Sequence, residues 1–76
     1  MNKYFKSEIG KRIQDMRQKK NMTQEEFAEK TGIMNAQQVS NIERGVSGVS
    51  LERFAEICKV LDAFSDYLLF GQSFKN

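Results

Sequence analysis

A short helix predicted in the middle of the chain carries amide and hydroxyl side chains on one face. At 3.6 residues per turn, Gln37, Asn41 and Arg44 form one stripe, and the neighbouring Ala36 and Ser40 are small. Gln and Asn amides can pair with N6 and N7 of adenine, and small neighbours allow a helix to lie deep in the major groove of DNA. The alternative interpretation is a polar face selected for solubility, although such a face more often carries Lys and Glu.

The composition argues against catalysis and against a metal site. The sequence has no His, which is the commonest general base and metal ligand, and its single Cys cannot form an internal disulfide. Cys58 lies at helical spacing from the apolar residues Phe54, Ile57 and Leu61, so we expect it to be a small core residue. We therefore expect no enzyme, no cofactor, no metal and no evident small-molecule site.

Neither a targeting segment nor a membrane segment is recognisable in the sequence. No apolar run follows the first lysines, and no segment approaches the ~18 apolar residues of a membrane span. With no disulfide pair either, we expect a protein of the reducing cytoplasm that does not associate with a membrane.

The charges are distributed unevenly along the chain. Residues 1–24 hold seven Lys and Arg against two acidic residues, whereas residues 25–76 hold five against eight. A basic first third favours a polyanionic partner. Charged runs are also typical of ordinary solvated helix faces, so the charge pattern alone leaves both interpretations open.

Apolar periodicity predicts five helices and no strand. The expected helices cover about residues 7–20, 23–31, 35–44, 51–61 and 65–70, each followed by a residue that can end a helix. Because helices this short are not stable alone, their apolar faces must converge in an all-α bundle. We expect residues 1–76 to form a single domain, with a core of about residues 7–71 and short frayed ends.

Capping patterns locate the starts of three helices. Thr23 and Glu26 have the spacing of a capping box, Asn35 and Gln38 repeat that spacing, and Ser50 can cap the fourth helix. On the fourth helix the spacing predicts an inward face made of Leu51, Phe54, Ala55, Ile57, Cys58 and Leu61.

The stretch from Ile9 to Gly71 resembles the phage repressor/Cro and Xre-type helix-turn-helix family. The motif residues that carry the resemblance are Thr23-Gln24-Glu25-Glu26-Phe27-Ala28, Gly32, and Val39-Ser40-Asn41-Ile42-Glu43-Arg44-Gly45. The resemblance implies a five-helix, lambda-repressor-like bundle with the helix-turn-helix at helices two and three. It also implies a sequence-specific, repressor-like transcriptional regulator whose third helix reads the major groove of double-stranded DNA.

The resemblance also implies roles for individual residues. Those expected to approach base edges are Ala36, Gln37, Ser40 and Asn41. Those expected near DNA phosphates are Thr23, Gln24, Asn35, Arg44, Ser47 and Arg17. Arg17 and Glu43 match a pair that forms an internal salt bridge in the family, and we expect this structural role to be the main one for Arg17.

Three departures from the family pattern affect these assignments. The turn over residues 32–35 has one extra residue, which we assign to the turn rather than to the start of helix three. The loop over residues 46–49 carries no charge, so phosphate binding there would rest on Ser47 and backbone N–H groups. Asp62 and Phe64 replace a usual Gly and a usual hydroxyl cap, and the Phe64 ring needs either burial in the bundle or a dimer contact.

One domain of this size buries too little surface for tight and specific DNA binding, so we expect a symmetric homodimer on a palindromic operator. The candidate dimer residues are Phe64, Tyr67, Leu68, Phe70 and Phe74. Apolar residues near a chain end can equally belong to the core. A second hypothesis is a protein-interaction module, such as an antitoxin, that binds DNA to regulate its own synthesis.

Overall fold

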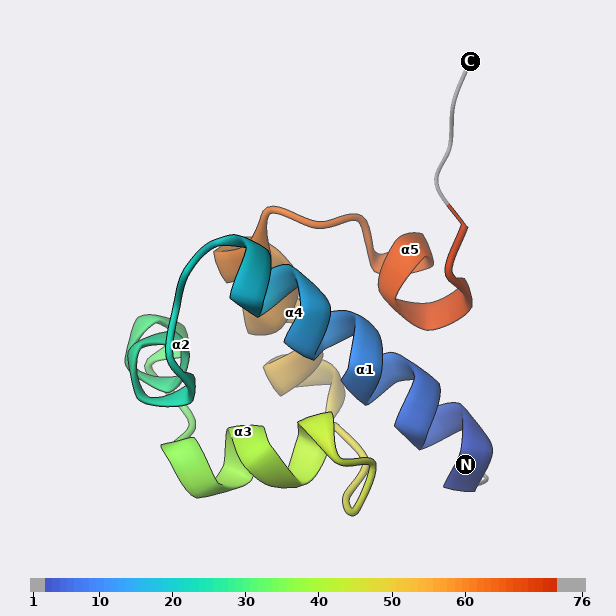
Figure 1. Cartoon of the computed structure of the whole chain (residues 1–76), viewed down its shortest axis with the longest axis horizontal. Helices are drawn as coiled ribbons and strands as arrows, with labels where there is room; N and C mark the ends of the chain where they lie inside the picture. Colours follow the sequence, from blue (N-terminus) through green and yellow to red (C-terminus); the bar gives the residue numbers. More distant parts are fainter. Residues whose placement is uncertain (1–2, 73–76) are drawn as a thin grey trace.

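The computed structural model describes residues 3–72 and folds them into five helices, with no strand among those residues. The helices are α1 (Lys3–Lys19), α2 (Gln24–Thr31), α3 (Ala36–Glu43), α4 (Leu51–Leu61) and α5 (Ser65–Phe70). In Figure 1, α1 crosses the molecule diagonally, α3 runs below it, and α2 is seen nearly end-on beside α3. The all-α fold predicted from the sequence is confirmed.

Helix α1 begins earlier than the sequence predicted. We expected a start near Ser7, but the helix already begins at Lys3. The reason lies in the apolar stripe of α1, because Phe5 packs against the core one turn before the buried Ile9. The helix ends just before Asn21, whose φ of 58° is left-handed, as expected for a residue that stops a helix.

Helices α2 and α3 both begin with the capping boxes predicted from the sequence. Thr23 Oγ1 accepts a hydrogen bond from the Glu26 N–H at 3.0 Å, and Glu26 Oε1 accepts one from the Thr23 N–H at 2.8 Å. Asn35 and Gln38 repeat the arrangement at 2.8 and 3.0 Å. With Asn35 as the cap of α3, the extra residue belongs to the turn, as predicted.

The core gathers apolar side chains from all five helices. Its buried members are Ile9, Ile13, Phe27, Ala28, Val39, Ile42, Phe54, Ile57, Leu61 and Leu68. The prediction for α4 was wrong at Leu51 and Ala55, which are exposed, Leu51 to 84%. Leu51 is the first residue of α4, so the periodicity extends the apolar stripe to a helix end at which the side chain is exposed.

Gly10 allows α1 and α3 to cross closely. It is buried within α1, and a Cβ at this position would overlap the carbonyl oxygens of Ile42 and Glu43 at the end of α3. Only glycine fits this crossing without displacing one of the two helices. The end of α3 is thereby held directly against α1.

Within the described part of the chain, none of the helices combines the length and the apolar character needed to cross a membrane.

Candidate nucleic-acid interface

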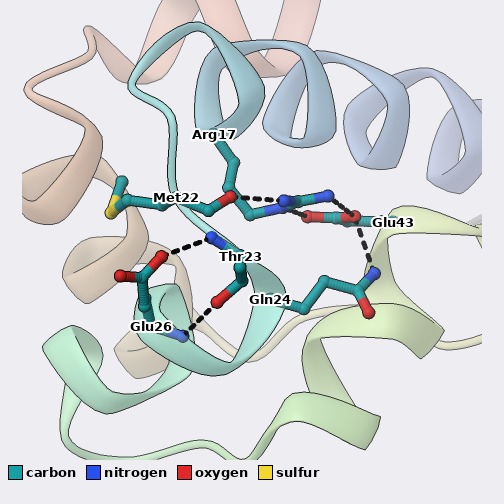
Figure 2. A network of polar contacts seen from close by, with 6 residues as sticks. All are labelled: Arg17, Met22, Thr23, Gln24, Glu26 and Glu43. Atoms are coloured by element: carbon teal, nitrogen blue, oxygen red, sulfur yellow. Dashed lines mark hydrogen bonds and ion pairs between the residues drawn. The ribbon is translucent and has the colours of Figure 1, made fainter.

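A buried ion pair joins α1 to the end of α3. Arg17 Nε donates to Glu43 Oε2 at 2.6 Å, and Arg17 Nη2 donates to Glu43 Oε1 at 3.1 Å. Arg17 Nη1 also donates to the backbone carbonyl of Met22 at 2.6 Å, in the link that leads into α2 (Figure 2). One guanidinium therefore positions α1, the entry to α2 and the end of α3 relative to one another.

The ion pair expected between Arg17 and Glu43 is thus present, and it engages the same guanidinium for which an additional phosphate contact was suggested. The Arg17 residue is only 7% exposed, and all three of its nitrogens already donate to protein oxygens. A DNA phosphate could reach this guanidinium only after the buried pair had been broken, which would leave the Glu43 carboxylate buried without its partner.

Gln24, which the sequence placed near a phosphate, is tied to the same pair. Its Nε2 donates to Glu43 Oε1 at 3.0 Å, so its side chain lies over the gap between α2 and α3 (Figure 2). Gln24 Oε1 has no hydrogen-bond partner among the residues that the structure describes. The Glu43 carboxylate therefore fixes the position of the Gln24 amide while leaving its oxygen available.

The outer face of α3 carries one connected set of hydrogen bonds. Gln37 Nε2 donates to Asn41 Oδ1 at 3.1 Å, and Arg44 Nη2 donates to the same oxygen at 2.9 Å. Arg44 Nε also donates to Ser40 Oγ at 3.4 Å. Gln37 and Arg44 are exposed, Ser40 and Asn41 are half-buried, and the half-buried Ala36 begins the helix. All four residues expected near base edges lie on α3, and Arg44 directly follows as its C-cap.

Thr23, Asn35 and Ser47, which were also assigned to phosphates, differ in which hydrogen-bonding groups remain unpaired. The side-chain oxygens of Thr23 and Asn35 serve as helix caps, and both residues are exposed. The backbone N–H of Ser47 donates to the Asn41 carbonyl at 3.3 Å, because the loop folds back over the end of α3. The Ser47 N–H is therefore paired within the chain, whereas the Ser47 hydroxyl has no partner within the described residues.

Two ionisable groups, Glu26 of α2 and Cys58 of α4, have shifted pKa values. The hydrogen bond from the Thr23 backbone N–H lowers the pKa of Glu26, which keeps this carboxyl charged beside the first turn of α2. Burial raises the pKa of the Cys58 thiol, which makes the reactive thiolate scarcer at neutral pH. Residues 3–72 contain no group of three or more His, Cys, Asp or Glu placed to hold a metal ion.

The residues suggested for a dimer contact fall into separate groups. Phe64 and Phe70 are 74% and 59% exposed, Tyr67 is half-buried, and Phe74 lies outside the described residues. Leu68 was wrongly included, because its side chain is fully buried in the core of this chain. Burial in the bundle, which was one explanation for the Phe64 ring, is also excluded by its exposure.

Two residues beside α5, Leu51 and Arg12, have roles that the sequence does not signal. The exposed Leu51 adjoins an apolar groove between α4 and α5 that is lined also by Phe54 and Leu69. Arg12 Nη1 donates to the backbone carbonyls of Leu68 and Leu69 at 3.0 and 3.3 Å, and so ties α5 to α1. No local pattern signals the Arg12 contact, because its acceptors are backbone atoms more than fifty residues away.

Comparison with known proteins identifies the family. A family model described as helix-turn-helix matches residues 13–66, which include all of α2, α3 and α4. The fold is similar to a crystal structure of the P22 c2 repressor protein in complex with synthetic operator 9T in the presence of Tl+. The TM-score is 0.80 and the identity 28%, over 84% of this chain and 96% of that chain. A search of the curated proteins returns no match. The chain belongs to the helix-turn-helix family of DNA-binding transcriptional regulators, in its phage-repressor and Xre type.

Proposed function

We propose that this protein is a repressor-like regulator that recognises a specific double-stranded DNA sequence by inserting α3 into the major groove. The observation that carries the proposal is the outer face of α3, where Gln37, Asn41 and Arg44 lie in one connected stripe. The similar P22 c2 repressor is a protein solved with its synthetic operator. Amide and guanidinium groups on an exposed helix face are the side chains that read base edges.

The rest of the helix-turn-helix would set the register of α3 on the duplex. The start of α2 offers the unpaired Gln24 oxygen and N–H groups, and the start of α3 is capped by the exposed Asn35. First-turn N–H groups and helix dipoles favour phosphate oxygens, which position a protein without reading sequence. Arg44 and the Ser47 hydroxyl are the remaining phosphate candidates beyond α3. The basic first third of the chain adds general attraction to DNA.

The proposed functional unit is a homodimer on a palindromic operator. Leu51, Phe64 and Phe70 expose large apolar side chains, and Leu51 also lines an apolar groove together with Phe54 of α4 and Leu69 of α5. Large apolar side chains left exposed are candidates for a contact with another protein. A symmetric contact there would give a dimer whose two copies of α3 read repeated half-sites.

The test is selection of bound duplexes from a random library, combined with sedimentation analysis of the free protein. We expect an enriched palindrome whose half-sites lie about 10 base pairs apart, or a multiple of that spacing, and a dimer in solution. The matched control is the Gln37→Ala/Asn41→Ala double variant, which changes only polar side chains on the outer face and should lose base preference at the two positions that these residues read. Enrichment of no sequence by the wild-type protein would overturn the proposal.

The antitoxin hypothesis draws on the same exposed side chains. Leu51, Phe64 and Phe70 could cover a different protein instead of a second copy of this chain. Sedimentation and selection together distinguish the antitoxin hypothesis from the regulator. A protein that is monomeric at micromolar concentration and binds only single half-sites favours a contact with a different protein. A dimer that binds the full palindrome favours the regulator.

A further inference from the structure

The amide oxygen of Asn41 is the meeting point of the α3 stripe. It accepts one hydrogen bond from Gln37 Nε2 at 3.1 Å and a second from Arg44 Nη2 at 2.9 Å. An amide oxygen has two lone pairs, so both acceptor positions of Asn41 are occupied. The Asn41 Nδ2 group has no acceptor among the described residues, which leaves its two N–H groups as what Asn41 can offer to a base.

Gln37 keeps a different set of hydrogen-bonding groups available to a base. Only one N–H of its Nε2 donates to Asn41, and its Oε1 has no partner within the described residues. Gln37 is also exposed, one turn before Asn41 on the same face. Gln37 therefore presents one donor and one acceptor side by side, whereas Asn41 presents donors alone.

Arg44 is held in the position that creates this difference. Its Nη2 donates to Asn41 and its Nε donates to Ser40 Oγ at 3.4 Å, so the guanidinium lies along the last turn of α3. A hydrogen bond from a charged donor is stronger than the neutral bond from Gln37. Arg44 therefore fixes which way the Asn41 amide faces.

We propose that Arg44 is a positioning residue that makes Asn41 a donor-only reader, so that Asn41 recognises guanine while Gln37 recognises adenine. The proposal rests on the proposed function, in which α3 lies in the major groove. Guanine presents two acceptors there, N7 and O6, which match the Asn41 donors. Adenine presents N7 together with the N6 amino donor, and it pairs with a side chain that both donates and accepts. Gln37 retains that combination and Asn41 does not.

A purely electrostatic role for Arg44 makes a different prediction. An arginine that contacts only phosphate supplies affinity without sequence information, so its removal weakens binding to all sequences alike. Removal of such an arginine also lowers the magnitude of the slope of log K against log salt by about one, because one phosphate contact is lost. Removal of a positioning arginine instead changes the identity of the preferred base at the position read by Asn41, whether or not overall affinity also falls.

The experiment compares selected sequences for four proteins. Wild type gives the reference consensus, and Asn41→Ala identifies the position that Asn41 reads because preference is lost there. Arg44→Ala tests the proposal. Lys30→Ala is the charge-matched control, since Lys30 is exposed at the far end of α2 and has no hydrogen bond or ion pair within the described residues.

We expect wild type to prefer guanine at the Asn41 position by about tenfold over adenine. In Arg44→Ala the freed Oδ1 should move that preference toward adenine, and Lys30→Ala should keep guanine. If Arg44→Ala binds too weakly for selection, four duplexes that differ only at this position are titrated at reduced salt with Arg44→Ala and Arg44→Lys.

Two results would overturn the role assigned to Arg44 and Asn41 while leaving the proposed function in place. One is any base other than guanine at the Asn41 position in the wild-type consensus. The other is an unchanged preference at that position in Arg44→Ala. Failure of wild type to enrich any sequence has a wider meaning, because it removes the proposed function and this assignment with it.

Discussion

Arg17 and Glu43 are 26 positions apart in the sequence and face each other across the crossing of α1 and α3, joined by hydrogen bonds of 2.6 and 3.1 Å. Both side chains are buried, at 8% and 1% exposure. The same carboxylate holds Gln24 at the start of α2. One buried carboxylate at the end of α3 therefore contacts both α1 and the start of α2.

Replacing Arg17 should destabilise the protein strongly. Arg17→Ala leaves the Glu43 carboxylate buried without a counter-charge, and loss of one partner of such a pair costs about 3–5 kcal/mol. Chemical denaturation measures the loss. The control is Lys19→Ala, which removes the exposed pair with Asp15 and should cost less than about 1 kcal/mol. Equal stability of the two variants would contradict the structural role of Arg17.

Adding one methyl group at the crossing of α1 and α3 should also destabilise the fold. Gly10→Ala improves helix propensity by about 1 kcal/mol, but its Cβ overlaps two backbone carbonyl oxygens that cannot move independently. Overpacking of this kind costs about 1–3 kcal/mol, so we expect a net loss of stability in thermal unfolding. Gln18→Ala, at an exposed position of the same helix, should be close to neutral. A stabilised Gly10→Ala variant would show that the crossing is looser than described.

The capping box of α2 predicts a pH dependence. The pKa of Glu26 is lowered from its ordinary value of about 4.5, mainly because its carboxylate accepts the hydrogen bond from the Thr23 N–H. A carboxyl with a lower pKa in the folded state stabilises the protein above its unfolded pKa. That contribution disappears as the pH falls through the folded pKa. Wild type should therefore be more stable than Glu26→Gln at pH 7, and the difference should shrink at acid pH. A difference that stays constant from pH 7 to pH 2 would contradict this.

The α3 stripe predicts local losses of base preference. Gln37→Ala and Asn41→Ala should each reduce discrimination at one operator position, by about 1–3 kcal/mol, without changing the other positions. Competition titrations with single-base operator variants measure this. If either variant keeps the wild-type preference at every position, the register of α3 on the DNA differs from the one proposed.

Leu68 and Phe64 should respond in opposite ways to substitution. Leu68→Ala removes a fully buried side chain and should cost about 2–5 kcal/mol in unfolding free energy. Phe64→Ser alters an exposed ring, so the fold should be unaffected while the proposed dimer dissociates at higher protein concentration. Sedimentation equilibrium and denaturation together distinguish the two. A Phe64→Ser variant that remains dimeric would place the contact elsewhere.

Much of the fold could be predicted because it depends on short-range patterns. The capping boxes at Thr23 and Asn35 are contacts between residues three positions apart, so residue identity and spacing were enough to locate both helix starts. The stripe of Gln37, Asn41 and Arg44 follows in the same way from 3.6 residues per turn. The Arg17–Glu43 pair was predicted only because the sequence resembles a known family.

Apolar periodicity was least reliable at the ends of helices. It placed Leu51 on an inward face, although the side chain of this first residue of α4 is 84% exposed. It could not separate Leu68 from Phe64 either, because both are apolar residues near the end of the chain. Which of them is buried depends on how the short α5 packs against α1, to which Arg12 ties it by hydrogen bonds.

The sequence by itself determined the helices, their caps and the amide-rich face of α3, since each of these arises from hydrogen bonds and periodicities within a few residues. Only the tertiary structure decided that the Arg17 guanidinium is buried, that Gln24 is held by Glu43, and that Leu68 is core. These depend on atoms brought together from distant parts of the chain. The hydrogen bonds that fill both acceptor positions of Asn41 span only three and four residues, but they depend on side-chain conformations that residue types do not specify.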